Sequence, residues 1–177
     1  MKIDMEILKF IQSNLRCDLL DTAMPLITKL GNGGILWIIC SLLLIIFPKT
    51  RKVGTAVAVS LALEALCCNV ILKPAVARLR PCDVDTTVQL LISHPGEFSF
   101  PSGHSGASFA AASALFFGKS PLGIPAFILA ALIGFSRLYL YVHYPTDVLA
   151  GTLIGIALGW IGNLLIRAAI CSTPRQK

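Results

Sequence analysis

The sequence predicts an all-α membrane protein, a polytopic bundle of five or six transmembrane helices. Of its 177 residues, 55% are hydrophobic and only 14% are charged, whereas about a quarter of the residues in a soluble domain carry a charge. A soluble core could not bury that much apolar surface. The hydrophobic residues are also gathered into long stretches, and the length suits a single domain over residues 1–177.

The apolar stretches approach the length that a membrane-spanning helix needs, which is about 20 residues. The four longest are 53–72, 102–117, 122–141 and 146–166. A fifth, 34–47, is shorter but carries no charged residue. Together the five stretches make up a predicted helical bundle over residues 33–168.

The N-terminal segment 1–31 differs from the bundle because charged residues interrupt its apolar pattern. Residues 5–15 place apolar side chains at helical spacing, with Glu6 and Lys9 on other positions, and residues 19–30 repeat this pattern. Such amphipathic helices usually lie in the membrane interface, so we expect five spans. If 19–30 crosses the membrane instead, the count rises to six.

The basic residues predict the orientation of the bundle. The formal net charge is +6, and in so apolar a chain the usual excess of cytoplasmic Lys and Arg explains it better than a nucleic-acid partner does. The basic residues between and after the spans are Lys49, Arg51, Lys52, Lys119, Arg167, Arg175 and Lys177. If the spans alternate, these residues face the cytoplasm, and the loops 73–101 and 142–145 face outward. We expect an integral membrane protein, in a bacterial source one of the inner membrane.

The first polar cluster follows the span 53–72 and reads Lys73-Pro-Ala-Val-Ala-Arg-Leu-Arg80-Pro. Lys73 and Arg80 are seven residues apart, about two helical turns, so they would share one face of a continued helix. Two cations at the membrane surface can bind a phosphate, Arg bidentately and Lys as a point charge. Taken alone, the pair is weak evidence for a site, because Lys and Arg at helix ends commonly reach up to the lipid headgroups.

The second polar cluster, Pro101-Ser102-Gly103-His104, opens the span 102–117. A helix N-terminus presents unpaired N–H groups and the positive end of the helix dipole to an anion. Ser102 adds a hydroxyl, Gly103 allows close approach of the backbone, and His104 can act as an acid or a base near pH 7. The competing interpretation is a capping serine followed by an incidental histidine.

The third polar cluster joins the last two spans and contains Arg137, His143 and Asp147. Asp147 follows His143 by four residues, so its carboxylate can reach the imidazole. A carboxylate on one ring nitrogen fixes the tautomer and leaves the other nitrogen as a nucleophile. Ionisable residues in so apolar a chain are energetically expensive and therefore indicate function.

Three further polar residues lie outside these clusters. Glu64 and Asn69 fall within the span 53–72. Hydrogen bonds between helices are common there, so we expect a structural contact rather than a substrate role. His94 lies in the loop 73–101, and we expect it to be solvated.

Together the clusters read K-x6-RP, then PSGH, then SR-x5-H-x3-D, over residues 73–147. This pattern resembles the type 2 phosphatidic acid phosphatase superfamily, which also includes bacterial undecaprenyl-diphosphate phosphatases and vanadium-dependent haloperoxidases. The resemblance implies that His143 attacks phosphorus to form a phosphohistidine and that Asp147 orients it. His104 would protonate the leaving oxygen and later activate water. The residues that would hold the phosphoryl oxygens are Lys73, Arg80, Ser102, Gly103 and Arg137.

The resemblance further implies a metal-independent lipid phosphate phosphohydrolase without a cofactor. Three cations and a helix N-terminus could stabilise the phosphoryl charge in place of Mg²⁺. The outer acids Asp83, Asp85 and Glu97 are not spaced to hold a metal. The expected partner is a membrane lipid, first undecaprenyl diphosphate, with phosphatidylglycerophosphate or phosphatidic acid as alternatives.

The alternative of another class is a membrane transporter, a flippase or an inactive scaffold. A transporter should carry its polar residues near the membrane midplane, on broken helices. Here the polar residues other than Glu64 and Asn69 gather at the predicted outer ends of the spans. The pattern therefore favours an enzyme, and it does not indicate an oligomeric state.

Overall fold

The structure, a computed structural model, describes residues 2–172. Over these residues all regular structure is helical, as expected. The elements are α1 (Lys2–Asn14), α2 (Asp18–Leu30), a 3-10 turn η1 (Asn32–Gly34), α3 (Ile35–Ile46), α4 (Arg51–Glu64), a π-helical segment η2 (Ala65–Leu72), α5 (Lys73–Val76), α6 (Pro81–Val84), α7 (Gly103–Phe117), α8 (Gly123–Tyr139) and α9 (Pro145–Ser172). Arg175 and Lys177, which enter the predicted orientation, lie outside the described residues.

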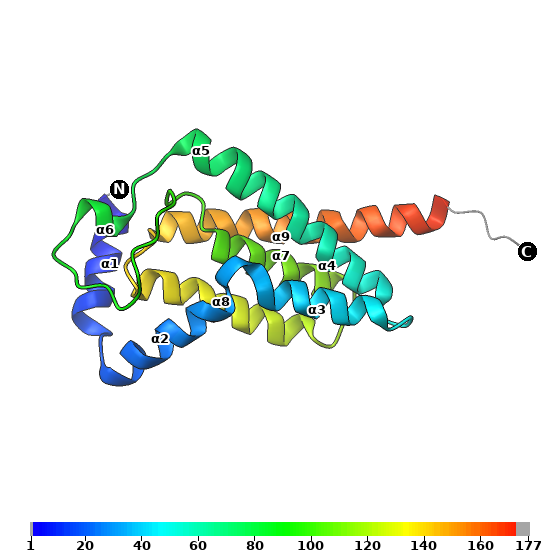
Figure 1. Cartoon of the computed structure of the whole chain (residues 1–177), viewed down its shortest axis with the longest axis horizontal. Helices are drawn as coiled ribbons and strands as arrows, with labels where there is room; N and C mark the ends of the chain where they lie inside the picture. The colour runs from blue at the N-terminus through cyan, green and yellow to red at the C-terminus, as the bar shows by residue number, and fades with distance from the viewer. Residues whose placement is uncertain (1, 173–177) are drawn as a thin grey trace, which may run out of the picture.

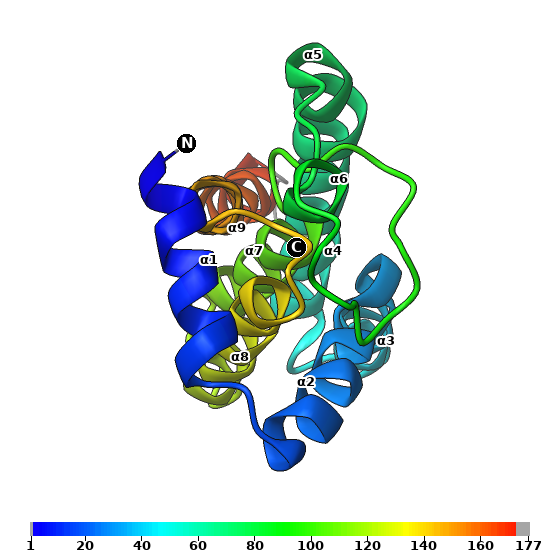
Figure 2. The ribbon, with the colours of Figure 1, turned by 90° about the vertical axis from the view of Figure 1, so that its left-hand side faces the viewer.

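The longer helices lie side by side along the long axis of the molecule, and α1 lies across one end of them (Figure 1). That end also holds the loop after α6 and the connection from α8 to α9 (Figure 2). Leu8 and Ile11 of α1 are buried in one apolar cluster with Tyr139, while Ile7 and Phe10 are exposed. The expected amphipathic helix is therefore present, and its place in the membrane interface stays a prediction.

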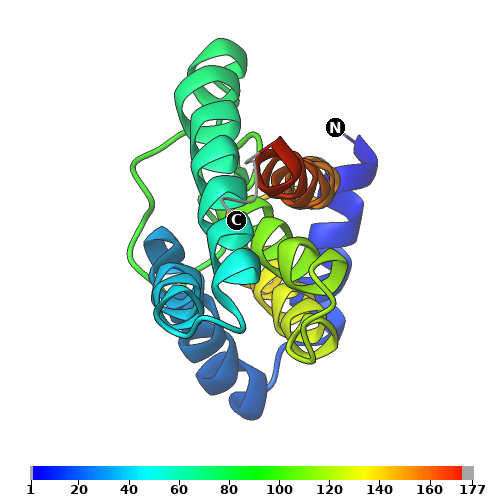
Figure 3. The same cartoon turned by 90° about the vertical axis from the view of Figure 1, so that its right-hand side faces the viewer.

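The helix α7 is the centre of the bundle, enclosed by α4, α8 and α9 (Figure 3). Its buried residues are almost all small: Ser105, Gly106, Ala107, Ser108, Ala110, Ala111, Ala112, Ser113 and Ala114. Three glycines of α9, spaced by four, face this helix: Gly151, Gly155 and Gly159. A Cβ atom on Gly151 would stand 2.5 Å from the carbonyl oxygen of Ser102. Small residues on both sides thus let α7 and α9 approach closely.

Replacement of Gly155 by leucine should destabilise the bundle. A Cβ atom at this position would stand 2.9 Å from the backbone nitrogen of Ala110, so α9 would have to move away from α7. Overpacking of this kind costs about 1–3 kcal/mol of unfolding free energy. Thermal unfolding in detergent should show a lower midpoint for Gly155→Leu but not for the control Leu153→Met, since Leu153 is 59% exposed. Equal midpoints would contradict this packing.

Among the described residues, length and composition identify two helical runs that can cross a membrane alone. They are Arg51–Val84 and Pro145–Cys171, and the bent pair Asp18–Leu30 with Asn32–Ile46 can form a third span. The apolar helix α8 is shorter, and α7 has 15 residues, which correspond to about 22 Å of helix. The count of five or six spans therefore stays a prediction.

The segment 19–30, expected to be an interfacial helix or a sixth span, continues into α3 through a bend of 42°. The bend lies at Gly33 and Gly34, whose φ angles of 57° and 65° fall in the left-handed region. Glycine adopts this region without the steric penalty of a Cβ atom. The helices α2 and α3 therefore have the form of a broken span or a re-entrant loop.

Large apolar side chains cover the outside of the bundle. Examples that are at least half exposed to the surroundings are Leu42, Leu43, Val70, Ile128, Leu153 and Trp160. In a soluble monomer, apolar surface of this extent would be an aggregation hazard. Lipid tails are the medium that such a surface fits, so the protein is an integral membrane protein.

Candidate active site

The three polar clusters of the sequence converge on one cavity, at the end of the bundle where α8 joins α9. The cavity has a volume of about 540 Å³, within the range typical of small-molecule sites. Six of the eight predicted site residues line it: Lys73, Arg80, Gly103, His104, Arg137 and His143. The other two, Ser102 and Asp147, are fully buried beside residues of the lining.

His143 lies in the connection between α8 and α9, and Asp147 lies in the first turn of α9. The Nδ1 atom of His143 is 3.6 Å from Oδ2 of Asp147, beyond the usual hydrogen-bonding distance. Ser99 bridges this gap, since its Oγ is 3.4 Å from Nδ1 and donates a 2.5 Å hydrogen bond to Oδ2. The other ring nitrogen, Nε2, accepts a 3.0 Å hydrogen bond from Arg80. These contacts favour a proton on Nδ1 and a lone pair on Nε2.

The environment of His143 keeps its imidazole neutral. Burial lowers the pKa of His143 to about 3, and the nearby cations Arg137 and Arg80 act in the same direction against the opposing Asp147 carboxylate. A histidine with a lowered pKa is protonated only below that value, so this ring is uncharged around pH 7. A neutral imidazole has the free electron pair that a nucleophile needs.

Three cations face the cavity, each in a different setting. Arg80 is oriented by the carbonyl oxygen of Glu97, to which its Nε donates at 2.7 Å. Lys73 pairs with the carboxylate of Glu97 and thereby lowers the pKa of that group. Since this carboxylate is 72% exposed, a phosphate group can take its place beside Lys73. Arg137 donates to Thr28 at 2.6 Å, and its Nε has no hydrogen-bond partner among the described residues.

The backbone conformation that brings Lys73 and Arg80 to the cavity differs from the predicted continuous helix. The prediction that they share a helix face is wrong, because α5 ends at Val76. Ala77 then adopts a left-handed φ of 46°, and the chain continues to an extended backbone at Arg80. The two cations meet because the chain turns, and helix periodicity has no part in it.

The N-terminus of α7 forms another part of the cavity wall. Ser102 caps the helix, since its Oγ accepts a hydrogen bond from the backbone N–H of Ser105 at 3.4 Å. A Cβ atom on Gly103 would stand 3.0 Å from Oδ1 of Asn69, so η2 packs closely here. His104 lies 2.9 Å from Asn32 through its Nε2. A helix N-terminus open to a cavity is suited to an anion.

Glu64 and Asn69 line the cavity as well. Both residues therefore border the cavity, and the expectation of a structural contact rather than a substrate role stays a prediction. Within the described part of the chain, Oε1 of Glu64 has no hydrogen-bond partner.

His94 is exposed in its loop, as expected, and its imidazole also pairs with Asp83 at 2.7 Å and lies 3.6 Å from the Cys82 sulfur. Between residues 2 and 172, these three residues are the one group of potential metal ligands whose donor atoms lie within 4.8 Å of one another. Asp83 also accepts the backbone N–H of Arg80 at 2.9 Å, which fastens this loop. The three residues do not line the 540 Å³ cavity, and catalysis without a metal stays a prediction.

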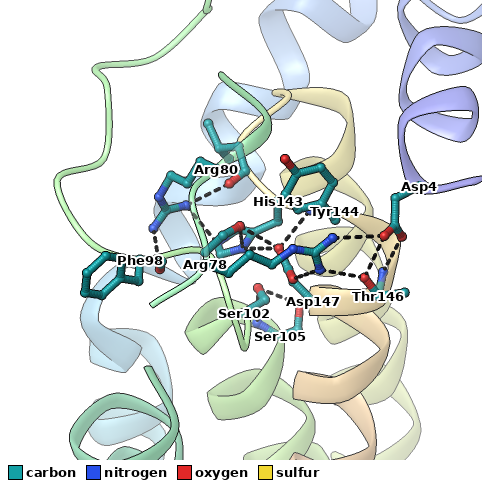
Figure 4. Close-up of polar contacts among 12 residues, drawn as sticks. Asp4, Arg78, Arg80, Phe98, Ser102, Ser105, His143, Tyr144, Thr146 and Asp147 are labelled. Atoms are coloured by element: carbon teal, nitrogen blue, oxygen red, sulfur yellow. Dashed lines mark hydrogen bonds and ion pairs between the residues drawn. The ribbon is translucent and has the colours of Figure 1, made fainter. Parts of the chain in front are cut away.

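Sequence reasoning missed three residues that hold the Asp147 carboxylate or its partners. Besides Ser99, they are Arg78, which donates to Asp147 Oδ1 at 2.6 Å, and Asp4, which accepts from Arg78 at 3.0 Å (Figure 4). Arg78 lies within the first polar cluster, so its charge was an available signal. Ser99 and Asp4 stand in segments without a motif, and nothing in the sequence distinguishes them.

A cavity with three cations and a neutral imidazole suits a phosphate group, and the apolar exterior suits a phosphate carried by a lipid. Fold and site thus define the class, a membrane enzyme of phosphoryl chemistry. Comparison with known proteins agrees, since the model of the PAP2 superfamily matches residues 53–170. The chain belongs to this superfamily and is a hydrolase of phosphoric esters or diphosphates. This favours an enzyme over the transporter, flippase or scaffold considered above.

Three relatives illustrate the similarity. The chain is 33% identical over 165 residues to an undecaprenyl-diphosphatase of Sulfolobus acidocaldarius, with 93% of this chain and 77% of the relative covered. The fold matches the crystal structure of Aquifex aeolicus LpxE with a TM-score of 0.78 and 33% identity, over 90% of this chain and 94% of the other. A transmembrane PAP2-type phosphatidylglycerolphosphate phosphatase from Bacillus subtilis matches with a TM-score of 0.76 and 28% identity, over 99% and 88%.

Proposed function

We propose that this protein is a metal-independent lipid phosphate phosphohydrolase that cleaves undecaprenyl diphosphate through a phosphohistidine intermediate. The observation that carries the proposal is the placement of His143. Nε2 lies beside a cation of the cavity, and Nδ1 lies beside Ser99 and Asp147. Burial also lowers the pKa of the ring, which favours its neutral form. The Sulfolobus acidocaldarius undecaprenyl-diphosphatase, at 33% identity, supports the choice of substrate.

In the first step of the proposed mechanism, Nε2 of His143 attacks the terminal phosphorus. A P–N bond forms while the P–O bond to the leaving group breaks. His104 takes up a proton when the anionic phosphate binds beside it, because a nearby negative charge favours the imidazolium, and it gives this proton to the departing oxygen. Positive charge develops on the attacking ring, and the Asp147 carboxylate stabilises it. The phosphoryl oxygens are held by Lys73, Arg80, Arg137 and the N-terminus of α7 at Ser102 and Gly103, which supply positioning and charge stabilisation.

In the second step, water attacks the phosphohistidine from the side that the leaving group has vacated. His104, now neutral, takes a proton from this water as the P–N bond breaks. Inorganic phosphate leaves, and His143 returns to its neutral form while His104 returns to its protonated form. Both steps use the same two histidines, so no further acid or base is required.

The same proposal places the cavity on the outer face of the membrane, which in a bacterial source is the inner membrane. The basic residues Lys49 and Lys119 lie in the α3–α4 and α7–α8 connections. These two connections are at the end of the bundle opposite to the α8–α9 connection (Figure 1). Basic loops preferentially remain in the cytoplasm. A carrier lipid dephosphorylated outside could then be recycled.

Phosphatidylglycerophosphate is the second candidate substrate, and one observation favours it. Glu64 and Asn69 offer a carboxyl and an amide to the cavity. These groups can bond the hydroxyl of a glycerol-bearing headgroup, whereas a prenyl chain has no such group to offer. The Bacillus subtilis phosphatidylglycerolphosphate phosphatase, at 28% identity, is consistent with this alternative. Phosphatidic acid is the third candidate.

The proposal is tested by phosphate release from the three lipids, with the protein purified in detergent. We expect the highest kcat/KM with undecaprenyl diphosphate. A higher kcat/KM with phosphatidylglycerophosphate or phosphatidic acid would replace the substrate and keep the mechanism. Absence of phosphate release from every lipid, by protein shown to be folded, would refute the proposed function.

Chelation of divalent metals should leave the rate unchanged. Positive charge at the site comes from three side chains and a helix N-terminus, which can stabilise the phosphoryl oxygens without Mg²⁺. The measurement is phosphate release in excess EDTA, with a Mg²⁺-dependent phosphatase assayed in parallel to show that chelation is effective. Loss of activity that Mg²⁺ restores would contradict the proposed charge stabilisation.

A further inference from the structure

A chain of charged contacts connects the N-terminal helix α1 to the proposed catalytic carboxylate (Figure 4). Arg78 stands at its centre, in the non-helical segment between α5 and α6. One amino group of its guanidinium donates to Asp147 at 2.6 Å and to Thr146 at 2.8 Å. The other donates to Asp4 of α1 at 3.0 Å. The guanidinium carbon also lies 3.8 Å from the centre of the Tyr144 ring.

The two oxygens of Asp147 have separate partners. Oδ2 accepts from Ser99 at 2.5 Å and from the backbone N–H of Tyr144 at 2.9 Å, and it is the oxygen nearest to His143. Oδ1 accepts from Arg78. The carboxylate is fully buried, and a buried charge without a partner is strongly unfavourable. Arg78 therefore neutralises the carboxylate and also fixes its rotation, so that Oδ2 stays turned toward His143.

Asp4 in turn fixes Arg78. Its side chain is 6% exposed, and Oδ2 accepts from both Arg78 and the hydroxyl of Thr146, the latter at 3.0 Å. Oδ1 accepts the backbone N–H of Thr146 at 3.2 Å. Asp4 thus joins α1 to the start of α9, directly beside Asp147. Neither Asp4 nor Arg78 lines the cavity, so both act through other residues.

We propose that Arg78, held by Asp4, is a positioning residue of the His143–Asp147 pair, and that α1 is therefore part of the active site. The inference rests on the proposed roles of His143 and Asp147. The Arg78 cation binds Oδ1 and holds the carboxylate in its rotation, which keeps the proton on Nδ1 of His143 and the lone pair on Nε2. Without it, the carboxylate can turn and the tautomer of the ring is no longer fixed.

Four variants test the inference by kinetics: Arg78→Gln, Asp4→Asn, the double variant, and Glu6→Gln as a control. Glu6 is an exposed acid on the same helix, so its loss removes the same charge from α1. We expect kcat to fall about 10- to 100-fold in Arg78→Gln, the range for loss of a charge-assisted hydrogen bond, with KM little changed. Asp4→Asn should lower kcat less. The double variant should match Arg78→Gln alone, because Asp4 acts through Arg78.

A second readout needs no substrate. The chain has three histidines, so ¹⁵N-histidine NMR of the protein in micelles can be assigned with one variant per histidine. Wild type and Glu6→Gln should show His143 protonated on Nδ1. Arg78→Gln and Asp4→Asn should show a mixture of tautomers, and Arg78→Lys, which restores the charge, should recover part of both kcat and the wild-type tautomer.

If Arg78→Gln changes neither kcat nor the tautomer of His143, the inference is overturned. It is also overturned if the only effect of Asp4→Asn and Arg78→Gln is a lower unfolding temperature. Failure of the proposed function is distinguishable from this. If the wild-type protein cleaves no lipid, the kinetic comparison is lost, but the tautomer of His143 still decides whether Arg78 and Asp4 position the ring.

Discussion

Replacement of His143 by alanine is expected to abolish phosphate release, lowering kcat by about 10⁴-fold or more. The substitution removes Nε2, the one neutral imidazole nitrogen that lies beside Arg80 in the cavity. The cations and the N-terminus of α7 remain, so the lipid should still bind. The measurement is phosphate release at saturating lipid, together with a binding assay that uses the same lipid.

His94→Ala is the matched control, because His94 lies in a loop and does not line the cavity. It should retain most of the activity. Rapid quenching of wild-type protein with ³²P-labelled substrate should trap a phosphoenzyme that is stable in base and labile in acid, as a phosphohistidine is, and His143→Ala should trap none. Substantial turnover by His143→Ala would remove His143 from the role of nucleophile.

Asp147→Asn is expected to lower kcat by about 10³- to 10⁴-fold while KM changes little, by analogy with the orienting aspartate of the serine-protease triad. The amide preserves the shape of the side chain but removes the negative charge that faces Nδ1 of His143 at 3.6 Å. It also leaves the Arg78 cation opposite a neutral group. The positive charge that develops on the attacking ring would then lack its stabilising partner.

The comparison of kcat with KM separates this effect from poor binding. Because Asp147 is fully buried, its loss should act on the chemical step and leave lipid affinity nearly intact. Thermal unfolding must accompany the kinetics, since a buried polar change can also destabilise the fold. A kcat equal to that of wild type, in folded protein, would exclude Asp147 from the mechanism.

The sequence predicts this site well where each motif lies at the end of a helix. Ser102, Gly103 and His104 open α7, and Asp147 lies in the first turn of α9. Helix ends of one bundle meet at the same face, so motifs far apart in the chain could be expected to converge. The structure brings all eight predicted residues together at one cavity, although their roles stay proposals.

The sequence fails where an irregular backbone decides the geometry. The chain leaves the helix at Ala77, a non-glycine residue with a φ of 46°, and no residue type announces such a conformation. Arg78 therefore turns toward Asp147, which helix periodicity from Lys73 cannot predict. Asp4 is distant in sequence from Arg78 and Thr146, which it contacts, and a single acid in an amphipathic helix is normally solvated. The bend between α2 and α3 was missed although two adjacent glycines mark it.

The close packing around α7 restricts how this sequence can diverge. Growth of any side chain at Gly151, Gly155 or Gly159 would push against α7, whereas Leu153 and Trp160 of the same helix α9 are exposed. Evolutionary drift should therefore be fast on the lipid-facing side of α9 and slow on the side that faces α7. The membrane tolerates any apolar side chain of suitable length, whereas the narrow space between α7 and α9 admits only the smallest residues.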